Sequence, residues 1–202
     1  MIDAHILPLQ HKLLHPLALL LVRLNVRADH VSIAGFLVGV GALPLLATQH
    51  YLWALAFILS NRLLDGLDGQ VARLTRSTDR GAFLDIALDF MFYALIPLGF
   101  ALADSTANAL AAAVLLAAFI GTGSSFLAFS LMAEKRGLHA KNFPSKGIYY
   151  LGGLTEGAET IALFVSFCLW PDLFSSLAYF FAFACALTIL SRWIQGWRML
   201  AD

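Results

Sequence analysis

Long apolar segments separated by short polar links fill most of this chain, and they constrain its fold more than any other feature. Of the 202 residues, 60% are hydrophobic and only 13% are charged. A helix needs about 20 apolar residues to cross a bilayer. The sequence predicts an all-α integral membrane protein rather than an ordinary soluble domain. We expect six transmembrane helices, at residues 31–48, 51–74, 82–103, 108–133, 149–170 and 173–193.

Basic residues are concentrated on alternate links. Twelve of the 13 Lys and Arg residues lie near the N-terminus, after the second segment, between the fourth and fifth segments, or at the C-terminus. The other links, around His50, at 104–108 and at 171–172, carry none. Cytoplasmic loops of membrane proteins are enriched in Lys and Arg. We therefore expect a protein of the inner membrane with both termini on the cytoplasmic side.

The residues before the first segment form a separate element. The stretch 7–26 is apolar but is interrupted by polar residues. A cleaved signal peptide is an alternative, although no small-residue cleavage site is present and a second apolar segment follows almost at once. We expect residues 1–27 to form an amphipathic helix in the headgroup layer and residues 28–202 to form the six-helix bundle. Since no long linker or repeat divides the chain, residues 1–202 are expected to be one domain.

Four aspartates flank the link between the second and third segments. Asp65 and Asp68 are three positions apart and Asp85 and Asp89 are four apart, so each pair shares one face of its helix. The short link lets both pairs point at one spot, which we expect to be cytoplasmic like the termini. An Asp in a membrane helix costs about 2.5 to 3.5 kcal/mol on insertion scales, so a cation is needed to compensate.

The chemistry of this cluster favours a hard divalent cation. Carboxylate oxygens favour Mg²⁺, Mn²⁺ or Ca²⁺, and no Cys or His cluster offers a zinc site. Two ions that share carboxylates are a common device for holding a phosphate. In a purely structural alternative, the aspartates only pair with nearby arginines, namely Arg62, Arg73, Arg76 and Arg80.

Small residues and one arginine lie between the two aspartate pairs. Gly69 and Gly81 remove side chains where a ligand or another backbone must come close, and Ala72 keeps the same face small. Arg73 offers a planar guanidinium suited to bidentate phosphate binding. Simple charge pairing would not require these small residues, so the pattern favours a phosphate-binding site.

The stretch resembles the signature of the CDP-alcohol phosphotransferase (phosphatidyltransferase) family. That signature reads Asp-x2-Asp-Gly-x2-Ala-Arg, then seven or eight residues, then Gly-x3-Asp-x3-Asp, and all eight fixed positions are present here with a seven-residue spacer. The approach to the first segment, residues 28–32, departs from the Pro-Asn-x-x-Thr form of many members. The resemblance implies a membrane enzyme, usually a homodimer, that uses Mg²⁺ or Mn²⁺, as two ions, to transfer a phosphatidyl group to an alcohol and release CMP.

The resemblance also implies roles for individual residues. Asp65, Asp68 and Asp85 would hold the metal ions, while Asp89 would complete the metal site and act as the general base on the acceptor hydroxyl. The expected donor is CDP-diacylglycerol, as in phospholipid biosynthesis. Its CDP group would be bound by Asp68, Gly69, Ala72, Arg73 and Gly81.

The start of the fifth segment bears on the acceptor. Relatives that use inositol phosphate carry Gly-x-x-Glu-Arg-x-x-Arg here, with arginines that bind the acceptor phosphate. This chain has Gly157 and Thr160 at the two arginine positions, and the Gly-Lys-x-Lys-Thr stretch of glycerophosphate-using relatives is also missing. We therefore expect an unphosphorylated alcohol, with Glu156, Glu159 and Lys146 as candidate contacts. Alternatively, the two glutamates pair with Arg62, and Lys146 is a headgroup contact.

Two other functions remain open at this point. Some members of the family transfer from soluble CDP-choline or CDP-ethanolamine to a lipid alcohol, and the motif does not separate the two directions. From another class, intramembrane carboxylates could mark a divalent-cation transporter. Against transport, all four aspartates gather near one face of the membrane. No feature indicates a nucleic-acid partner.

Overall fold

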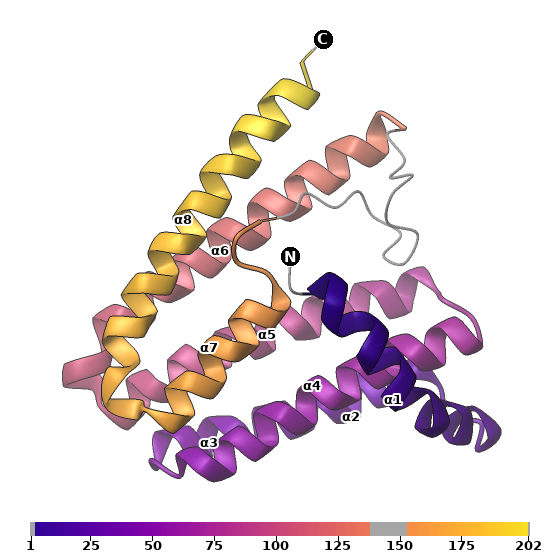
Figure 1. Ribbon diagram of the computed structural model, residues 1–202, viewed down its shortest axis with the longest axis horizontal. Helices are drawn as coiled ribbons and strands as arrows, with labels where there is room; N and C mark the ends of the chain where they lie inside the picture. Colours follow the sequence, from indigo (N-terminus) through magenta and orange to yellow (C-terminus); the bar gives the residue numbers. More distant parts are fainter. Residues whose placement is uncertain (1–2, 138–152, 202) are drawn as a thin grey trace.

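The computed structural model describes residues 3–137 and 153–201, and within these ranges all regular structure is helical (Figure 1). The helices are α1 (Asp3–Arg23), α2 (Ala28–Val40), α3 (Ala42–Ala47), α4 (Tyr51–Leu74), α5 (Asp79–Ala103), α6 (Ser105–Lys135), α7 (Gly157–Leu169), the short 3-10 helix η1 (Pro171–Leu173) and α8 (Phe174–Met199). The prediction of an all-α protein is confirmed.

Four of the expected membrane segments are long and apolar enough to cross a bilayer. They are α2 together with α3, then α5, then α6, and finally η1 together with α8. The second expected segment coincides with α4, which has 24 residues but carries three charged side chains along its length before Gly69. The fifth expected segment, 149–170, begins outside the described residues, and α7 has only 13 residues. The structure thus shows a helical membrane protein with four clear candidate spans.

Polar side chains set the starts of several helices. The Thr78 hydroxyl accepts a hydrogen bond from the Gly81 backbone N–H at 3.0 Å, and Asp104 accepts one from Ala107 at 3.0 Å. These are N-caps, which satisfy N–H groups that have no partner within the helix. They begin α5 and α6 sharply after short links. α5 and α6 lie side by side, whereas α4 and α5 both pack against α2.

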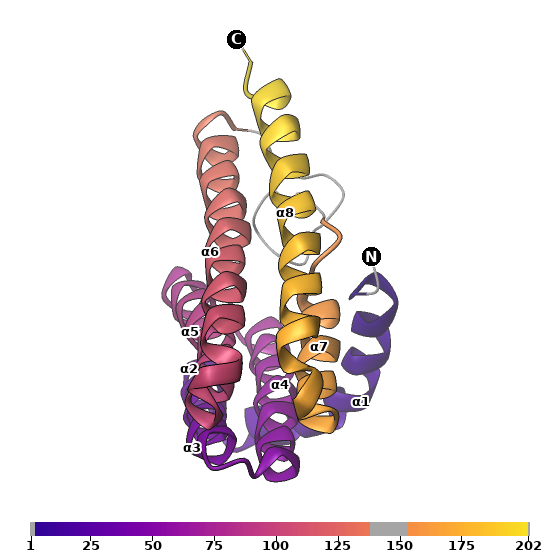
Figure 2. The same cartoon turned by 90° about the vertical axis from the view of Figure 1, so that its left-hand side faces the viewer.

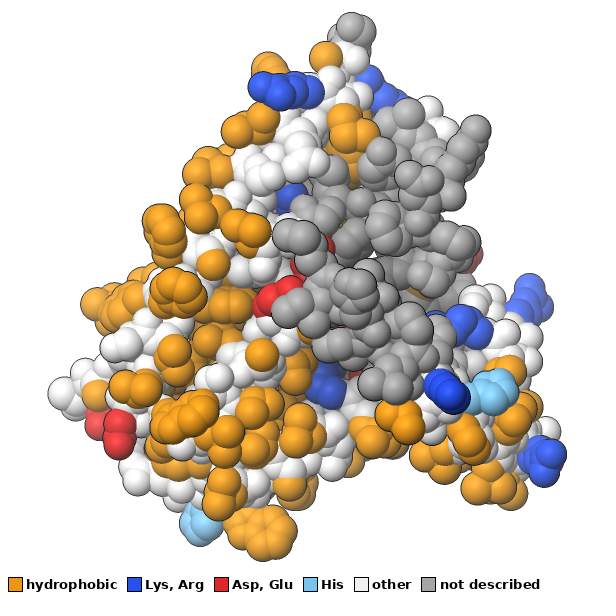
Figure 3. Space-filling model, in the orientation of Figure 1, with side chains coloured by type: hydrophobic (Ala, Val, Ile, Leu, Met, Phe, Trp, Pro, Cys, Tyr) orange, Lys and Arg blue, Asp and Glu red, His pale blue; other side chains and the backbone are white. Residues whose placement is uncertain are grey.

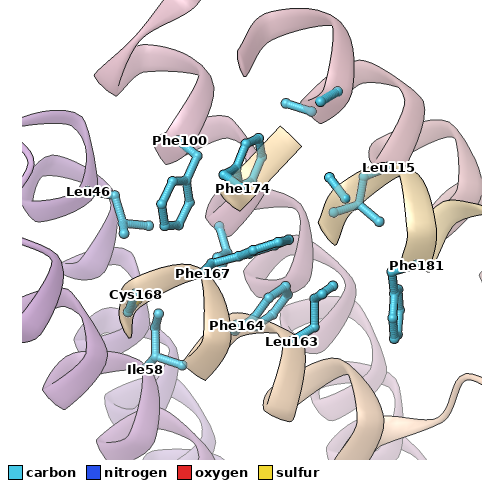
Figure 4. Close-up of a cluster of buried hydrophobic side chains, with 14 of the residues drawn as sticks. Leu46, Ile58, Phe100, Leu115, Leu163, Phe164, Phe167, Cys168, Phe174 and Phe181 are labelled. Carbon is cyan, nitrogen blue, oxygen red and sulfur yellow. The ribbon is translucent and has the colours of Figure 1, made fainter. Parts of the chain in front are cut away.

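The helices form two packed groups around a shared aromatic core. α2, α4 and α5 pack together, while α6 and α8 run side by side over most of their length (Figures 1 and 2). Rings from α5, α7 and α8 meet between the groups (Figure 4). Phe100 stacks on Phe174 with ring centroids 4.6 Å apart, and both rings contact Phe167. Such close aromatic packing holds α7 against both groups.

Helix α1 packs against the half of α4 that carries the aspartates. Leu14 and Ala18 of α1 are buried with Val31 of α2 and with Leu67 and Val71 of α4. Leu67 directly precedes Asp68 in the chain, so this contact supports the backbone that presents Asp68.

Hydrophobic side chains also cover much of the outside of the molecule. Figure 3 shows them over its lower left part. Many large apolar side chains are more than half exposed, including Leu110, Ile120, Phe180 and Trp197. A surface of this kind suits contact with lipid rather than with water.

Candidate metal and nucleotide site

Three aspartates from two helices converge in the fold. Asp65 and Asp68 lie on α4 and Asp85 lies on α5, and one carboxylate oxygen from each lies within 4.8 Å of the other two. Asp68 is buried, Asp65 is half-buried and Asp85 is exposed. The i, i+3 spacing on α4 and the short link to α5 produce this convergence, as the sequence predicts. We call these three residues the three-aspartate group.

The three-aspartate group fits a hard divalent cation. Oxygen ligands lie about 2.0–2.1 Å from Mg²⁺ and about 2.3–2.6 Å from Ca²⁺, so oxygens on one ion are at most about 4–5 Å apart. The three carboxylate oxygens meet this condition. The group offers neither sulfur nor imidazole, which are the ligands of structural zinc sites. Its donors therefore suit Mg²⁺ or Mn²⁺.

The fourth aspartate lines the same pocket as the other three and is paired with an arginine. Arg62 of α4 donates from Nη2 to Oδ1 of Asp89 at 2.7 Å, and its Nη1 lies 3.7 Å from Oδ2 of Asp65. The sequence predicts that four carboxylates meet in one place. All four line one pocket, and the oxygens of three of them lie within 4.8 Å of one another.

Arg62 is fixed by further contacts within the bundle. Its Nε donates to Oδ1 of Asn61 at 2.7 Å, and the Asn61 amide donates in turn to the Gly35 carbonyl at 2.9 Å. The guanidinium also lies over the Phe92 ring, with its central carbon 4.5 Å from the ring centroid. Sequence reasoning named Arg62 only as a structural partner for carboxylates and missed Asn61. The available signal for Arg62 and Asn61 was the presence of two polar side chains, about one helical turn before Asp65, in an otherwise apolar segment.

A small pocket opens between α2, α4 and α5 above these side chains. Helix α2 supplies a wall that sequence reasoning also missed, and there Ser32 lines the pocket together with Asp68. The lining residues are Ser32, Gly35, Phe36, Asn61, Arg62, Asp65, Asp68, Asp85, Leu88 and Asp89. We call this cavity the acidic pocket.

The residues predicted to bind CDP lie beside the acidic pocket along α4 and at the start of α5. The Arg73 guanidinium lies over Gly69, where a Cβ atom would come within 3.3 Å of its Nη1. The absence of a side chain at Gly69 therefore leaves space for the Arg73 guanidinium. Ala72, one residue before Arg73, is half-buried.

The first turn of α5 is tied to the start of α2. Arg80 donates to Oδ2 of Asp29 from Nη2 at 2.7 Å and from Nε at 3.2 Å. A Cβ atom on Gly81 would lie 3.2 Å from Oδ1 of Asp29, so glycine lets the two helix ends approach. Asp29 is one of the positions that depart from the Pro-Asn-x-x-Thr form, and here its carboxylate pairs with Arg80.

The predicted acceptor residues lie at the start of α7. Glu156 and Glu159 form a capping box, in which the Glu156 side chain accepts from the Glu159 backbone N–H and Oε2 of Glu159 accepts from the Glu156 backbone N–H at 3.2 Å. Oε1 of Glu156 also accepts from the Gly153 backbone N–H at 3.0 Å. Thr160 is buried and Gly157 is exposed. Lys146 lies outside the described residues. Both glutamates thus have a structural use in starting α7.

The segment before α7 is fastened to α8 by one hydroxyl. Oγ1 of Thr188 accepts from the Leu154 and Thr155 backbone N–H groups at 3.1 and 3.2 Å and contacts the Thr155 hydroxyl at 3.0 Å. A Cβ atom on Gly153 would clash with the Thr188 methyl group. These contacts fix where α7 begins relative to α8.

Taken together, fold and pocket define a helical membrane protein with a carboxylate site suited to a divalent metal. Residues 25–190 match the family model of the CDP-alcohol phosphatidyltransferases, so the chain belongs to that family and is a transferase. The predicted resemblance is confirmed. Membership of this transferase family also excludes the alternative function of a divalent-cation transporter, which the carboxylates alone left open.

Two relatives span nearly the whole chain. The chain is 50% identical over 200 residues to the inner membrane protein YnjF of Escherichia coli (strain K12), covering 99% of this chain and 97% of that protein. It is 26% identical over 184 residues to the archaetidylinositol phosphate synthase of Methanothermobacter thermautotrophicus, covering 88% and 87%.

Solved structures of one enzyme share the fold. Phosphatidylinositol phosphate synthase (PgsA1) of Mycobacterium tuberculosis in complex with manganese and citrate has a TM-score of 0.70 and 25% identity, covering 90% of this chain and 88% of that one. The same enzyme with CDP-DAG bound has a TM-score of 0.66 and 24% identity, covering 92% and 94%.

Proposed function

We propose that this protein transfers a phosphatidyl group from CDP-diacylglycerol to an alcohol, in a metal-dependent reaction that releases CMP. The observation that carries the proposal is the convergence of Asp65, Asp68 and Asp85 beside Gly69 and Arg73. The related enzyme PgsA1, solved once with CDP-DAG and once with manganese and citrate, supports a CDP-lipid donor and a divalent ion. The direct test is CMP release from CDP-diacylglycerol by the purified protein, with CDP-choline plus diacylglycerol as the competing substrate pair.

The residues divide the work of this reaction. Asp65, Asp68 and Asp85, with Asp89 completing the site, would hold the metal as two ions, which would supply positive charge to the phosphate oxygens. Gly69, Ala72, Arg73 and Gly81, together with Asp68, would hold the CDP group. Asp89 would take the proton of the acceptor hydroxyl. The hydroxyl oxygen forms the new bond to the lipid phosphorus, the bond from that phosphorus to CMP breaks, and CMP leaves with the electron pair.

The planar head of Arg73 gives a prediction for donor binding. Arg73→Lys keeps the charge but loses the two parallel donors that a pyrophosphate accepts, so we expect the KM for CDP-diacylglycerol to rise by about tenfold. The measurement is CMP release as a function of donor concentration. Arg76→Lys, in the exposed link between α4 and α5, is the matched control and should change KM less than about twofold. Equal effects of the two substitutions would place the donor phosphates elsewhere.

The acceptor is proposed to be an unphosphorylated alcohol. Gly157 and Thr160 stand where relatives that use inositol phosphate carry arginines, and Thr160 is buried. We expect free alcohols to have a kcat/KM at least about tenfold above that of their phosphate esters. A CMP-release screen over serine, choline, glycerol, inositol and their phosphates measures this. A preference for glycerol phosphate or inositol phosphate over every free alcohol would overturn the proposal.

A substitution at Glu156 can separate the effect of its negative charge from its role in capping α7. Glu156→Gln keeps one carbonyl oxygen that can accept the capping hydrogen bond from the Glu159 N–H, so α7 should still begin at Gly157. If the carboxylate charge contacts the acceptor, as we propose for Glu156 and Glu159, this variant will raise the KM for the alcohol and leave the KM for CDP-diacylglycerol unchanged. An unchanged KM for the alcohol would leave Glu156 with its capping role alone.

Lys146 is a further proposed acceptor contact, and this proposal comes from the sequence.

We further propose that the protein has one domain, residues 1–202, with six membrane spans, an interfacial α1, and both termini and the acidic pocket on the cytoplasmic side of the inner membrane. The distribution of Lys and Arg supports this orientation. Leu13 and Leu20 of α1 are exposed, as expected of a helix in contact with lipid. A homodimer is proposed from the family resemblance.

Cysteine labelling tests this orientation. Ser77 lies in the link between α4 and α5, Thr106 lies at the start of α6, and both are exposed. In spheroplasts that carry a protein in which Cys168 and Cys185 are replaced by Ser, Ser77→Cys should resist an impermeant maleimide, whereas Thr106→Cys should react. The reverse pattern would invert the orientation.

A further inference from the structure

The chain enters α7 through a short non-helical segment that lies against α8. Residues 153–156 precede α7 and are not helical, while α8 belongs to a candidate membrane span. Because the hydrocarbon region holds no water, each backbone N–H at that depth needs a partner within the protein. One side chain near the middle of α8, Thr188, supplies the partner for two of them.

The Thr188 side chain is fully buried, and the segment depends on its hydroxyl. Oγ1 accepts from the Leu154 N–H at 3.1 Å and from the Thr155 N–H at 3.2 Å. Its hydrogen is left for the Ala184 carbonyl of α8 at 3.2 Å or for the Thr155 hydroxyl at 3.0 Å. A hydroxyl has two acceptor lone pairs and one donor hydrogen, so valine at this position would leave both N–H groups without this acceptor.

The surroundings of Thr188 hold the same segment closely. A Cβ atom on Gly153 would clash with the Thr188 methyl group and would lie 3.4 Å from Nη2 of Arg192. Arg192 is buried about one turn after Thr188 on α8, and its Nη1 donates to the Thr122 carbonyl of α6 at 2.9 Å. The face of α8 that holds residues 153–156 is therefore itself tied to α6.

This attachment reaches a proposed acceptor residue. Glu156 is the last residue of the segment, and its Oε1 accepts from the Gly153 N–H at 3.0 Å. The helix that follows, α7, packs against α4, which carries Asp65 and Asp68. The place of the Glu156 carboxylate relative to α4 thus depends on where Thr188 holds the segment.

We propose that Thr188 is a positioning residue for the acceptor alcohol: its hydroxyl fixes residues 153–156 and so holds the Glu156 carboxylate where the alcohol binds. The inference deepens the proposed function and rests on it for its kinetic consequence. The fixing of the segment is independent of any substrate and can be measured by itself.

Amide hydrogen exchange of the detergent-solubilised protein gives the first test, read by mass spectrometry on peptides that contain Leu154 and Thr155. Thr188→Val keeps the shape of the side chain but removes the acceptor, so these amides should exchange at least about tenfold faster. Thr188→Ser keeps the hydroxyl and should stay within about threefold of wild type. Thr122→Val is the matched control, because its hydroxyl donates to Phe119 of its own helix. Unchanged exchange in Thr188→Val would overturn the proposal.

Kinetics give the second test, with the free alcohol among serine, choline, glycerol and inositol that has the highest kcat/KM. Thr188→Val should raise the KM for this alcohol by about tenfold and keep the KM for CDP-diacylglycerol within about twofold. Thr188→Ser should restore the wild-type KM for the alcohol. An unchanged KM for the alcohol, or an equal rise in both KM values, would reduce Thr188 to a packing role and overturn the proposal.

Gly153 offers a test that does not require Thr188→Val to fold. Gly153→Ala adds a Cβ atom that clashes with the Thr188 methyl group, so it should displace the segment and raise the KM for the alcohol by about tenfold. Thr188→Ser lacks that methyl group, so the double variant should return to within about threefold of the wild-type KM. Additive losses in the double variant would contradict the proposal.

Failure of this inference can be told apart from failure of the proposed function. If wild-type protein releases no CMP from CDP-diacylglycerol with any of these alcohols, the proposed function fails. If wild-type protein is active but Thr188→Val matches it in amide exchange and in both KM values, the role of Thr188 alone fails.

Discussion

Replacing Asp65, Asp68 or Asp85 by Asn will reduce CMP release from CDP-diacylglycerol by about 10²- to 10³-fold or more. Each substitution keeps the size of the side chain but removes one negative oxygen ligand from a group whose oxygens lie within 4.8 Å of one another. Without the bound metal, the negative charge that develops on the phosphate in the transition state loses its fixed counter-charge. Stabilisation of this charge contributes a large part of the rate enhancement in phosphoryl transfer. The measurement is kcat/KM for CMP release by the purified variants.

Chelation provides the companion measurement. EDTA should remove the activity of the wild-type enzyme, and Mg²⁺ or Mn²⁺ should restore it. Asp172→Asn, in the exposed η1 turn away from the acidic pocket, is the matched control and should retain wild-type activity. Full activity in EDTA, or full activity of any of the three Asn variants, would contradict the assignment.

Truncating Phe164 to Ala should produce the largest loss of stability among the aromatic residues of α7. Phe164 is fully buried, and its ring lies 5.7 to 6.4 Å from the rings of Tyr93, Phe119, Phe167 and Phe92. Phe→Ala changes in packed cores cost about 3–5 kcal/mol, largely because the cavity cannot collapse. Unfolding of the detergent-solubilised protein by heat or denaturant measures the loss.

Phe180→Ala is the matched control for this substitution. Its side chain is 71% exposed on α8, on a surface suited to lipid or detergent. Truncation there leaves no internal cavity, so we expect a change below about 1 kcal/mol. A loss for Phe180→Ala equal to that for Phe164→Ala would mean that the outer face of α8 is packed against another protein surface rather than lipid.

The hydrophobic pattern predicted the long helices well and the shorter elements poorly. Segment 51–74 matches α4 at both ends, and 82–103 falls within α5. The expected first span, 31–48, overlaps the candidate span Ala28–Ala47, which α2 and α3 form together with Gly41 between them. In the expected segment 149–170, the described residues 153–156 precede the helix, because a capping box of Glu156 and Glu159 starts α7 at Gly157. Hydropathy sums over a window and is insensitive to such a cap.

The candidate site could be predicted as far as spacing within a helix determines it. Asp65, Asp68 and Asp85 converge because helical periodicity and a short link require it. The pairing of Asp89 with Arg62 could not be predicted, since it depends on the α5 side chains Phe92 and Tyr93 that surround the guanidinium. Glu156 and Glu159 show the reverse case: the sequence pattern of a capping box was present, but a family comparison drew attention to an acceptor role instead.

The pair between Arg62 and Asp89 also bears on how the chain enters the membrane. By itself, α4 would bring three charged side chains into the hydrocarbon, a cost of several kcal/mol that its apolar residues must offset. Arg62 has one partner three residues away on α4 and a closer partner on α5. Only four residues, 75–78, separate these two helices. If α4 and α5 enter the membrane together, Arg62 and Asp89 can neutralise one another as the chain leaves the translocon, so the order in which these helices insert matters for the charged pocket.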